Sequence, residues 1–299
     1  MIYYPYLRGR QFDLKALTTF ATEPHQNVVP VIEPVRDIAA LPKTLQAFID
    51  HQQPVAVIQN PQVDHYNYQA EQRYPISALF ESPWVQRAVI LTPLLPPDQL
   101  NDALVIVQHY ADLKLFIDHN WLPASATVLA PPEARMRRLL TANQQAFGHL
   151  FDHNEVRDHS ADFAKMPDSF FTNDQTFARQ YHETGFGDYL TQGKPYFEHG
   201  HPSRTVTLHL IYLQDGMVRI HHFVSDQNED FKHQKEKYFE ALAKTIAWFD
   251  TQPAINQTPA IDQLRVLAEA HKFPGMGILK QLTLEHHLVM MARYMDEMH

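Results

Sequence analysis

Short apolar runs alternate with amphipathic segments along the first half of the chain. Segments 41–52, 97–111 and 132–146 repeat their apolar residues at helical spacing. Alternation of strands and helices is typical of a parallel α/β sheet, whose strands read as apolar throughout because both faces are buried. The pattern therefore predicts a TIM-like (β/α) barrel. Its strand candidates are VVPVIEPV (28–35), PVAVIQNP (54–61), RAVILTPL (87–94), LKLFIDHN (113–120), ATVLAP (126–131) and FGHLFDHN (147–154).

The pattern changes beyond residue 203. Two strand-like runs within 204–226 meet at Gln214-Asp215-Gly216, and Asp-Gly between such runs predicts an antiparallel hairpin. Residues 230–250 place apolar residues on one helical face and lysines opposite, as in a helix that covers a sheet. We expect three parts: a (β/α)-barrel-like domain over 1–250 that the hairpin closes, a linker over 251–260, and C-terminal helices over 261–299 packed on the barrel.

Composition narrows the class of protein. A chain of 299 residues with 44% hydrophobic content can bury a full core. The formal net charge of −9 argues against general nucleic-acid binding, although a local basic groove stays open. The absence of cysteine excludes disulfides, thiolate nucleophiles and cysteine-ligated metals. Because no signal peptide and no membrane-length apolar run is recognised, we predict a cytoplasmic protein without a membrane partner.

Polar residues interrupt the strand candidates at their carboxyl ends. These ends line the site in (β/α)₈ barrels, so polar side chains distant in sequence would converge there. We expect Glu33 as a catalytic carboxylate and Asn60, Asp118 and Asp152 as substrate-binding residues. The alternative is that each residue caps the helix that follows its strand. The interrupting residues are Glu33, Asn60, Thr92, Asp118, His119, Asp152 and His153.

The segment ETGFGDYLTQG (183–193) has a glycine on each side of Phe186, in a chain with only nine glycines. The pattern predicts a seventh strand in which Gly187 lets the backbone pass close to a neighbour. Asp188 would then be catalytic and Tyr189 substrate-binding at the same mouth. The alternative is a glycine turn whose aspartate caps locally. A dinucleotide fingerprint, a P-loop, a GxSxG elbow and an HExxH motif are all absent.

Histidine is the other abundant site-forming residue, with 19 copies. His221 and His222 are adjacent on a predicted strand, so at most one of them can face a given pocket. His209 on the partner strand is the expected companion of the inward one. We predict His209 and His222 as catalytic residues at the mouth that holds Asp188. Without sulfur ligands, a bound metal would be a divalent ion such as Mg²⁺, Mn²⁺ or Zn²⁺, and the pair His199 and His201 is a weaker metal candidate.

Two arginines precede a helix that is expected to begin near Gln11. Arg8 and Arg10 lie on either side of Gly9, and two guanidinium groups beside a helix N-terminus can hold a phosphate or carboxylate. We therefore include both arginines as substrate-binding residues. The alternative is that they form ion pairs that pin the N-terminal segment to the barrel.

The order of motifs along the chain resembles a known family. The stretches YYPYLRGRQFDLKAL, VVPVIEPV, IQNP, GFGDY, VTLHLIY, IHHFVSD, KYFEALAK and HKFPGMGILKQLTLEHH together are similar to an uncharacterised bacterial family related to the phage Beta-protein family. The resemblance implies a variant TIM barrel, often encoded near mobile-element or defence genes, and it transfers no reaction. It draws attention to Arg8, Arg10, Glu33, Asn60, Asp188, Tyr189, His209, His222, Ser225, Lys280 and His286.

Two function classes stay open at this point. One is a metal-assisted hydrolase or phosphodiesterase-like enzyme for an anionic substrate, with Glu33 or Asp188 as base or metal ligand and a histidine as acid. The other is a non-catalytic recognition protein that binds a partner encoded nearby, in phage conflict or on a mobile element. Function depends on the site and not on the fold, so the fold alone does not choose between them.

Overall fold

The computed structural model describes residues 1–25, 27–155, 157, 159–197 and 204–297. It divides into two compact units by internal contacts. Unit 1 consists of residues 1–152 and 174–189, and unit 2 consists of residues 153–173 and 190–299. The chain therefore leaves unit 1 after the β8 strand, returns to it for one further helix and strand, and then completes unit 2.

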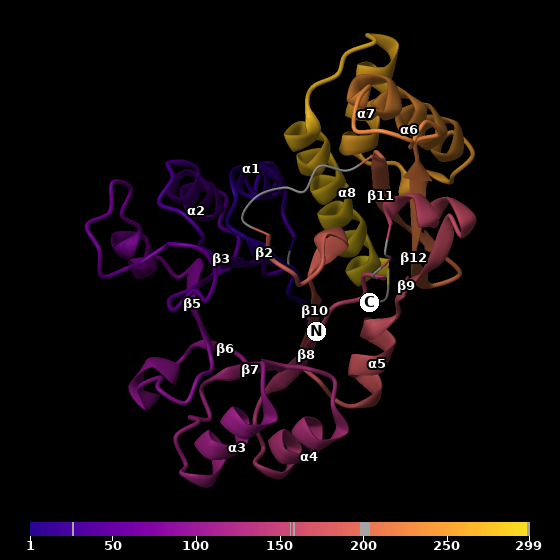
Figure 1. Ribbon diagram of the computed structural model, residues 1–299. Coiled ribbons are helices and arrows are strands. Elements are labelled where there is room, and N and C mark those ends of the chain that lie inside the picture. The colour runs from indigo at the N-terminus through magenta and orange to yellow at the C-terminus, as the bar shows by residue number, and fades with distance from the viewer. Residues whose placement is uncertain (26, 156, 158, 198–203, 298–299) are drawn as a thin grey trace. The chain divides into compact units, whose positions relative to one another are not determined.

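Unit 1 is built on one parallel sheet, in which the described residues form nine strands in the order β1-β10-β8-β7-β6-β5-β4-β3-β2. The sheet is curled, and the helices lie on its outer side (Figure 1). Its strands are β1 (Ile2–Tyr3), β2 (Tyr6–Arg8), β3 (Val31–Glu33), β4 (Val55–Ile58), β5 (Val85–Ile90), β6 (Leu104–Ile106), β7 (Thr127–Ala130), β8 (Phe147–Phe151) and β10 (Gly185–Asp188). Its helices are α1 (Gln11–Phe20), α2 (Ala40–Asp50), α3 (Tyr110–Asp118), α4 (Ala134–Ala142) and α5 (Asp174–Gln180), with short 3₁₀ helices η1 (Ser77–Glu81) and η2 (Pro97–Leu100).

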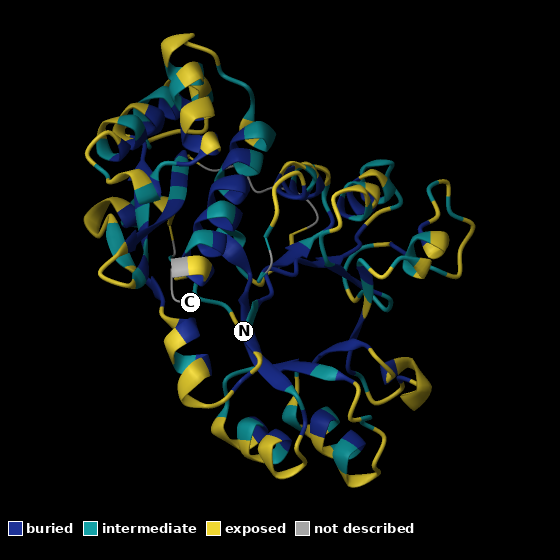
Figure 2. Cartoon of the chain, turned by 180° about the vertical axis from the view of Figure 1, so that it is seen from behind, coloured by how far each residue is buried: buried dark blue, intermediate teal, exposed yellow. Residues whose placement is uncertain are grey.

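The strands of unit 1 are mostly buried, while its helices expose one side (Figure 2). Successive side chains of a strand face opposite sides of the sheet. Leu104 and Ile106 accordingly belong to one apolar cluster, whereas Val105 and Val107 belong to another that includes residues of α3 and α4. Burial on both faces explains why these strands read as continuous apolar runs, and the predicted parallel α/β sheet is confirmed.

Two of the predicted elements are wrong. Segment 97–111 was expected as a helix, but it contains η2 and the strand β6, because residues 103–107 are buried on both sides of the sheet. Segment 113–120 was expected as a strand, but its first six residues end helix α3, which buries Leu113 and Phe116 at helical spacing. Both segments are short and apolar, and periodicity does not separate a buried strand from a helix in such cases.

The two edges of the curled sheet are formed by neighbouring stretches of chain. β1 pairs with β10, and β2 pairs with β3. Between β1 and β2, the N–H of Tyr4 donates to the carbonyl of Phe186 at 2.8 Å, and the N–H of Val31 donates to that of Pro5 at 2.8 Å. Residues 2–8 thus form both ends of the sheet order, and they bond to β10 at one end and to β3 at the other.

Unit 2 contains the predicted hairpin. Strands β11 (Thr207–Gln214) and β12 (Met217–Val224) pair antiparallel, and the turn residues Asp215 and Gly216 both have positive φ, at 53° and 72°. This backbone matches the type I′ turn that Asp-Gly favours. The hairpin pairs with β9 (Asp168–Thr172) in a separate three-stranded sheet. It therefore adds no strand to the parallel sheet, and the expectation that it closes the barrel is wrong.

Helices cover one face of this second sheet. α6 (Gln234–Phe249) and α7 (Pro259–Glu269) pack their apolar residues with those of β11 in a single cluster, and α8 (Met276–Glu297) contacts β11 as well. Short 3₁₀ helices are η3 (Ser160–Lys165), η4 (Leu190–Gln192) and η5 (Ala254–Asn256). The expected linker 251–260 contains η5 and the start of α7. The helices predicted within 230–250 and 261–299 are confirmed, while the division into domains stays a prediction.

Candidate functional site

An ion pair lies at the carboxyl ends of β2 and β3. Arg8 and Glu33 are register partners on these strands, and their side chains form a salt bridge. Glu33 is fully buried and also accepts hydrogen bonds from the Tyr6 hydroxyl at 2.6 Å and from the N–H of Gln62 at 2.7 Å. A buried carboxylate with three such partners is held in one position. Glu33 therefore anchors Arg8.

Two aromatic rings and a second carboxylate lie near this ion pair. The rings of Tyr6 and Tyr189 are 5.0 Å apart, and the guanidinium of Arg8 lies 5.1 Å from the centre of the Tyr6 ring. Burial raises the pKa of Tyr189 to about 12, while the charge of Arg8 opposes this shift and that of Asp152 adds to it. The structure brings together Arg8, Glu33 and Tyr189 from the predicted site, through contacts with one another or with Tyr6. Asp152 directly follows β8.

Asp188 faces the other side of the sheet from Tyr189. Its Oδ1 accepts a hydrogen bond from the Tyr3 hydroxyl at 2.8 Å, and both residues are buried. The pKa of Tyr3 is raised, first by burial and then by the charge of Asp188. Tyr189 belongs to the apolar cluster that contains Tyr4 and Tyr6, whereas Tyr3, the partner of Asp188, lies outside that cluster, as alternation along the strands requires. The structure therefore separates Asp188 from the Arg8–Glu33 pair.

Three other predicted site residues have local roles. The Asn60 amide is bonded twice to the backbone of Ile90, donating to its carbonyl at 2.8 Å and accepting from its N–H at 2.8 Å. Asp118 ends helix α3, where it forms an exposed ion pair with Lys114 at 2.5 Å, so its expected place at a strand end is wrong. Arg10 directly precedes α1, which begins at Gln11 as predicted.

A buried charge cluster on the outer side of the parallel sheet had no signal in the sequence. His149 on β8 contacts the carboxylates of Asp174 on α5 and Glu183 through its two ring nitrogens. Burial alone would lower the pKa of His149, but hydrogen bonds to Asp174 and Glu183 outweigh it and raise the pKa to about 9. Arg137 binds the other oxygen of Glu183 at 3.2 Å. These residues are far apart in the sequence, and the packing of α4 and α5 on the sheet brings them together.

The second site lies in unit 2, on one face of its three-stranded sheet. His209 and His222 are register partners, and their Nδ1 atoms are 2.6 Å apart. The prediction that His209 lies beside the inward-facing one of the two adjacent histidines is confirmed. Burial and then the neighbouring His222 lower the pKa of His209 to about 3, and burial lowers that of His222 to about 4. Both rings are therefore neutral at pH 7, and Phe163 packs against each of them.

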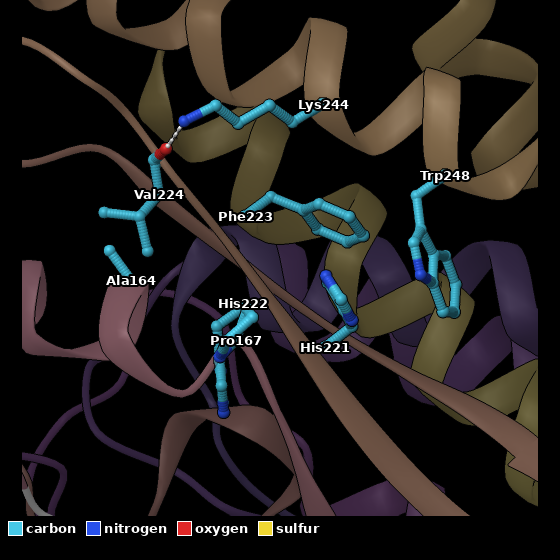
Figure 3. A pocket seen from close by; sticks show the side chains of 8 residues that line it. All are labelled: Ala164, Pro167, His221, His222, Phe223, Val224, Lys244 and Trp248. Carbon is cyan, nitrogen blue, oxygen red and sulfur yellow. Dashed lines mark hydrogen bonds between the residues drawn. The ribbon is translucent and has the colours of Figure 1, made fainter.

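His221 faces the opposite side of this sheet. Its ring lies toward Trp248 and Phe223, whereas His222 points away from them (Figure 3). Asp168, at 3.3 Å, is a partner of His221, and the rings of His221 and Trp248 are 4.7 Å apart. The hollow on this side has a volume of about 280 Å³. The two rings point to opposite sides of the strand, as alternation predicts, although both residues contribute to the lining of this hollow.

Acid should destabilise the protein through its buried neutral histidines. His209, His222 and His286 all have pKa values lowered, to between about 3 and about 4, mainly by burial. The unfolded chain binds protons below about pH 6.5 while the native state does not, so the stability falls as the pH drops from 6.5 toward 4.

Urea unfolding at pH 7.5, 6 and 5 measures this dependence. His222→Gln should reduce the slope of stability against pH in this range, because one lowered pKa is removed. Gln46→Ala, at an exposed position of α2 without a titratable side chain, is the control and should leave the slope unchanged. Equal slopes for His222→Gln and the unmodified protein would contradict the expectation.

Two further residues that the resemblance marked have structural roles, and the histidine pair considered as a metal candidate lies outside the described residues. The buried His286 is bonded through its ring nitrogens to Thr258 and the Ile211 carbonyl, each at 2.8 Å. The Ser225 hydroxyl accepts from the N–H of Val206 at 3.1 Å. His199 and His201 are outside the described residues. Across the described part of the chain, no group of three or more His, Asp or Glu side chains is placed to hold a metal ion.

Comparison with known proteins identifies no relative from which a role for these sites could be inferred. No protein-family model matches the chain, and no curated protein is significantly similar to it. The resemblance to the phage Beta-protein family therefore stays a prediction. In the described ranges, no helix is both long and apolar enough to span a membrane. Asp188 belongs to unit 1 and the two histidines to unit 2, and their meeting at one mouth also stays a prediction.

Proposed function

We propose that the parallel sheet of unit 1 is a TIM-type barrel closed by the N-terminal segment. Support comes from residues 2–8, which hydrogen bond to β10 through β1 and to β3 through β2. Pro5 interrupts this segment, and proline has no N–H for a sheet. If β1 and β2 are counted as one strand, the nine strands of the sheet become eight, the number of a (β/α)₈ barrel.

We propose further that this barrel is a hydrolase or phosphodiesterase-like enzyme that binds the anionic group of its substrate through Arg8. The observation that carries the proposal is the position of Arg8, held by the buried Glu33 while 16% of its own side chain stays exposed. A guanidinium has five N–H donors and suits phosphate or carboxylate groups. Substrates of barrel enzymes bind at the carboxyl ends of the strands, where Arg8 lies.

Asp152 is the proposed general base. It follows β8, two residues after Leu150, whose side chain shares an apolar cluster with Tyr6 and Tyr189. Alternation along the strand directs Asp152 to this same side, in agreement with its effect on the pKa of Tyr189. A carboxylate near a bound anionic group can take the proton of an attacking water. Glu33 then serves as the residue that positions Arg8.

Phosphate binding tests the role of Arg8. Calorimetric titration with inorganic pyrophosphate should show binding that Arg8→Gln weakens about tenfold or more, because a charge-assisted contact is lost. Arg8→Lys keeps the charge opposite Glu33 and should bind with intermediate affinity. The control is Arg135→Gln, which alters an exposed ion pair with Glu133. Pyrophosphate affinity that is the same in all these variants would refute the proposed anion site.

Hydrolysis of bis(4-nitrophenyl) phosphate tests the reaction separately. Asp152→Asn should retain pyrophosphate affinity and lose about a hundredfold or more in rate, the typical contribution of a general base. Pyrophosphate binding that depends on Arg8, with no hydrolysis of any phosphodiester tested, would instead favour the alternative of a non-catalytic recognition protein.

A further inference from the structure

A small cavity in unit 2, independent of the anion site proposed for unit 1, contains His209 and His222. We call it the two-histidine pocket. It has a volume of about 160 Å³, and Phe163, Phe171 and Ile220 form its apolar walls. Ser169 and Gln192 add polar groups to its lining. Eight of the eleven lining residues come from β9, β11, β12, η3 and η4, and the other three are residues 153–155, which follow β8. The residues of the three strands lie on the face of the sheet opposite His221.

Two buried polar atoms of this lining have no hydrogen-bond partner in the protein. They are Nε2 of His222, a residue that is only 5% exposed, and Oγ of Ser169. Ser169 is the register partner of Ile220, so its side chain faces the same side of the sheet as that of His222. A buried polar atom without a partner is destabilising, and proteins rarely keep one without a ligand, water or function. Two of them at one cavity indicate an occupant.

The histidine pair defines the hydrogen-bonding character of the occupant. One Nδ1 must donate to the other, so one ring has a lone pair on Nε2 and the other has an N–H there. The Ser169 hydroxyl both donates and accepts. A molecule that carries a donor and an acceptor on one edge complements such a lining. Glu155 is the one carboxylate of the lining, and its charge is paired with Arg157. The two imidazoles are neutral, and a further charge beside Phe163 and Phe171 would be costly to desolvate, so the occupant would be uncharged.

The dimensions of the pocket limit the occupant to one ring. A cavity of about 150 Å³ holds one benzene molecule in a protein interior. The Phe163 ring lies 4.3 Å from that of His222 and 4.9 Å from that of His209, which leaves an aromatic wall for a flat molecule. We propose that the two-histidine pocket binds a neutral, six-membered nitrogen heterocycle whose edge offers both a hydrogen-bond donor and an acceptor, as in a pyrimidine base.

Titration of the full-length protein with small probes at pH 7.5 tests this proposal. Uracil and 2-pyridone should bind with a Kd below about 1 mM, and benzene and benzoate about tenfold more weakly or not at all. The binding can be followed by ligand-observed NMR. Absence of binding of both heterocycles at 10 mM, or equal affinity for benzene, would overturn the proposal.

Substitutions in the pocket test whether the probe binds there. Ser169→Ala should weaken 2-pyridone binding about three- to tenfold, as expected for one hydrogen bond, and it removes only one hydroxyl. His222→Phe keeps a ring of similar size and should weaken binding at least as much. His221→Phe is the matched control, because its side chain faces the other side of the same strand. Unchanged affinity in both pocket variants would contradict the assignment, as would a high-resolution structure in which 2-pyridone fails to displace a water bonded to Ser169 and His222.

Discussion

Gly187→Ala is expected to lower the free energy of unfolding by about 3 kcal/mol or more. A Cβ at this position would lie 2.3 Å from the carbonyl oxygen of Tyr4 and 3.2 Å from a methyl group of Leu150. The nearer atom belongs to the backbone of residues 2–8, which cannot move without breaking its hydrogen bonds to β10. The change in urea midpoint, at constant slope, measures the loss.

Gly216→Ala is the matched control for this substitution. Gly216 lies at the hairpin turn with φ of 72°, and nothing lies within 4 Å of a Cβ built there. Alanine at this position suffers only the strain of its backbone conformation, about 1 kcal/mol. If Gly187→Ala costs no more than Gly216→Ala, the close approach of β10 to the N-terminal segment is not a constraint on the sequence.

The glycines of GFGDY illustrate how far the sequence predicts the site. Their rarity led to the prediction of a close backbone approach at Gly187, and the short distance to Tyr4 confirms it. The same pattern did not reveal that Asp188 and Tyr189 face opposite sides of the sheet, although the alternation of strand residues contains that information. Once the limits of β10 are known, Tyr189 belongs with Tyr6 and Asp188 with Tyr3.

Features of the fold that depend on tertiary contacts could be predicted only in part from this single sequence. The hairpin was predicted because Asp-Gly selects its turn locally, but its pairing with β9 depends on a strand in an insertion that has no apolar run. The Arg8–Glu33 pair was anticipated as the ion-pairing alternative for the N-terminal arginines, and its partner follows from the register of β2 with β3. The contacts of His149 depend on how α5 packs, and no spacing along the chain encodes them.

The second large effect is expected in the buried charge cluster of His149, Asp174, Glu183 and Arg137. Glu183→Gln should lower the free energy of unfolding at pH 7 by about 3 kcal/mol, because removal of one partner from a buried ion pair leaves the other charge uncompensated. Glu183 is buried and binds both His149 and Arg137. The matched control is Glu133→Gln, which breaks an exposed ion pair with Arg135 and should cost about 0.5 kcal/mol or less.

The pH dependence of stability distinguishes the loss of this charge interaction from a simple packing defect. The pKa of His149 is raised to about 9 in the folded protein, against about 6.5 in the unfolded chain. Its contribution is therefore complete below about pH 6.5 and is lost as the pH rises through 9. Glu183→Gln removes one of the two carboxylates that raise this pKa, so its stability should fall less than that of the unmodified protein between pH 7 and 9.5. Urea unfolding across this range, with NMR titration of the His149 ring, measures both quantities. A pKa of His149 that is unchanged in Glu183→Gln would show that Asp174 alone keeps the ring protonated.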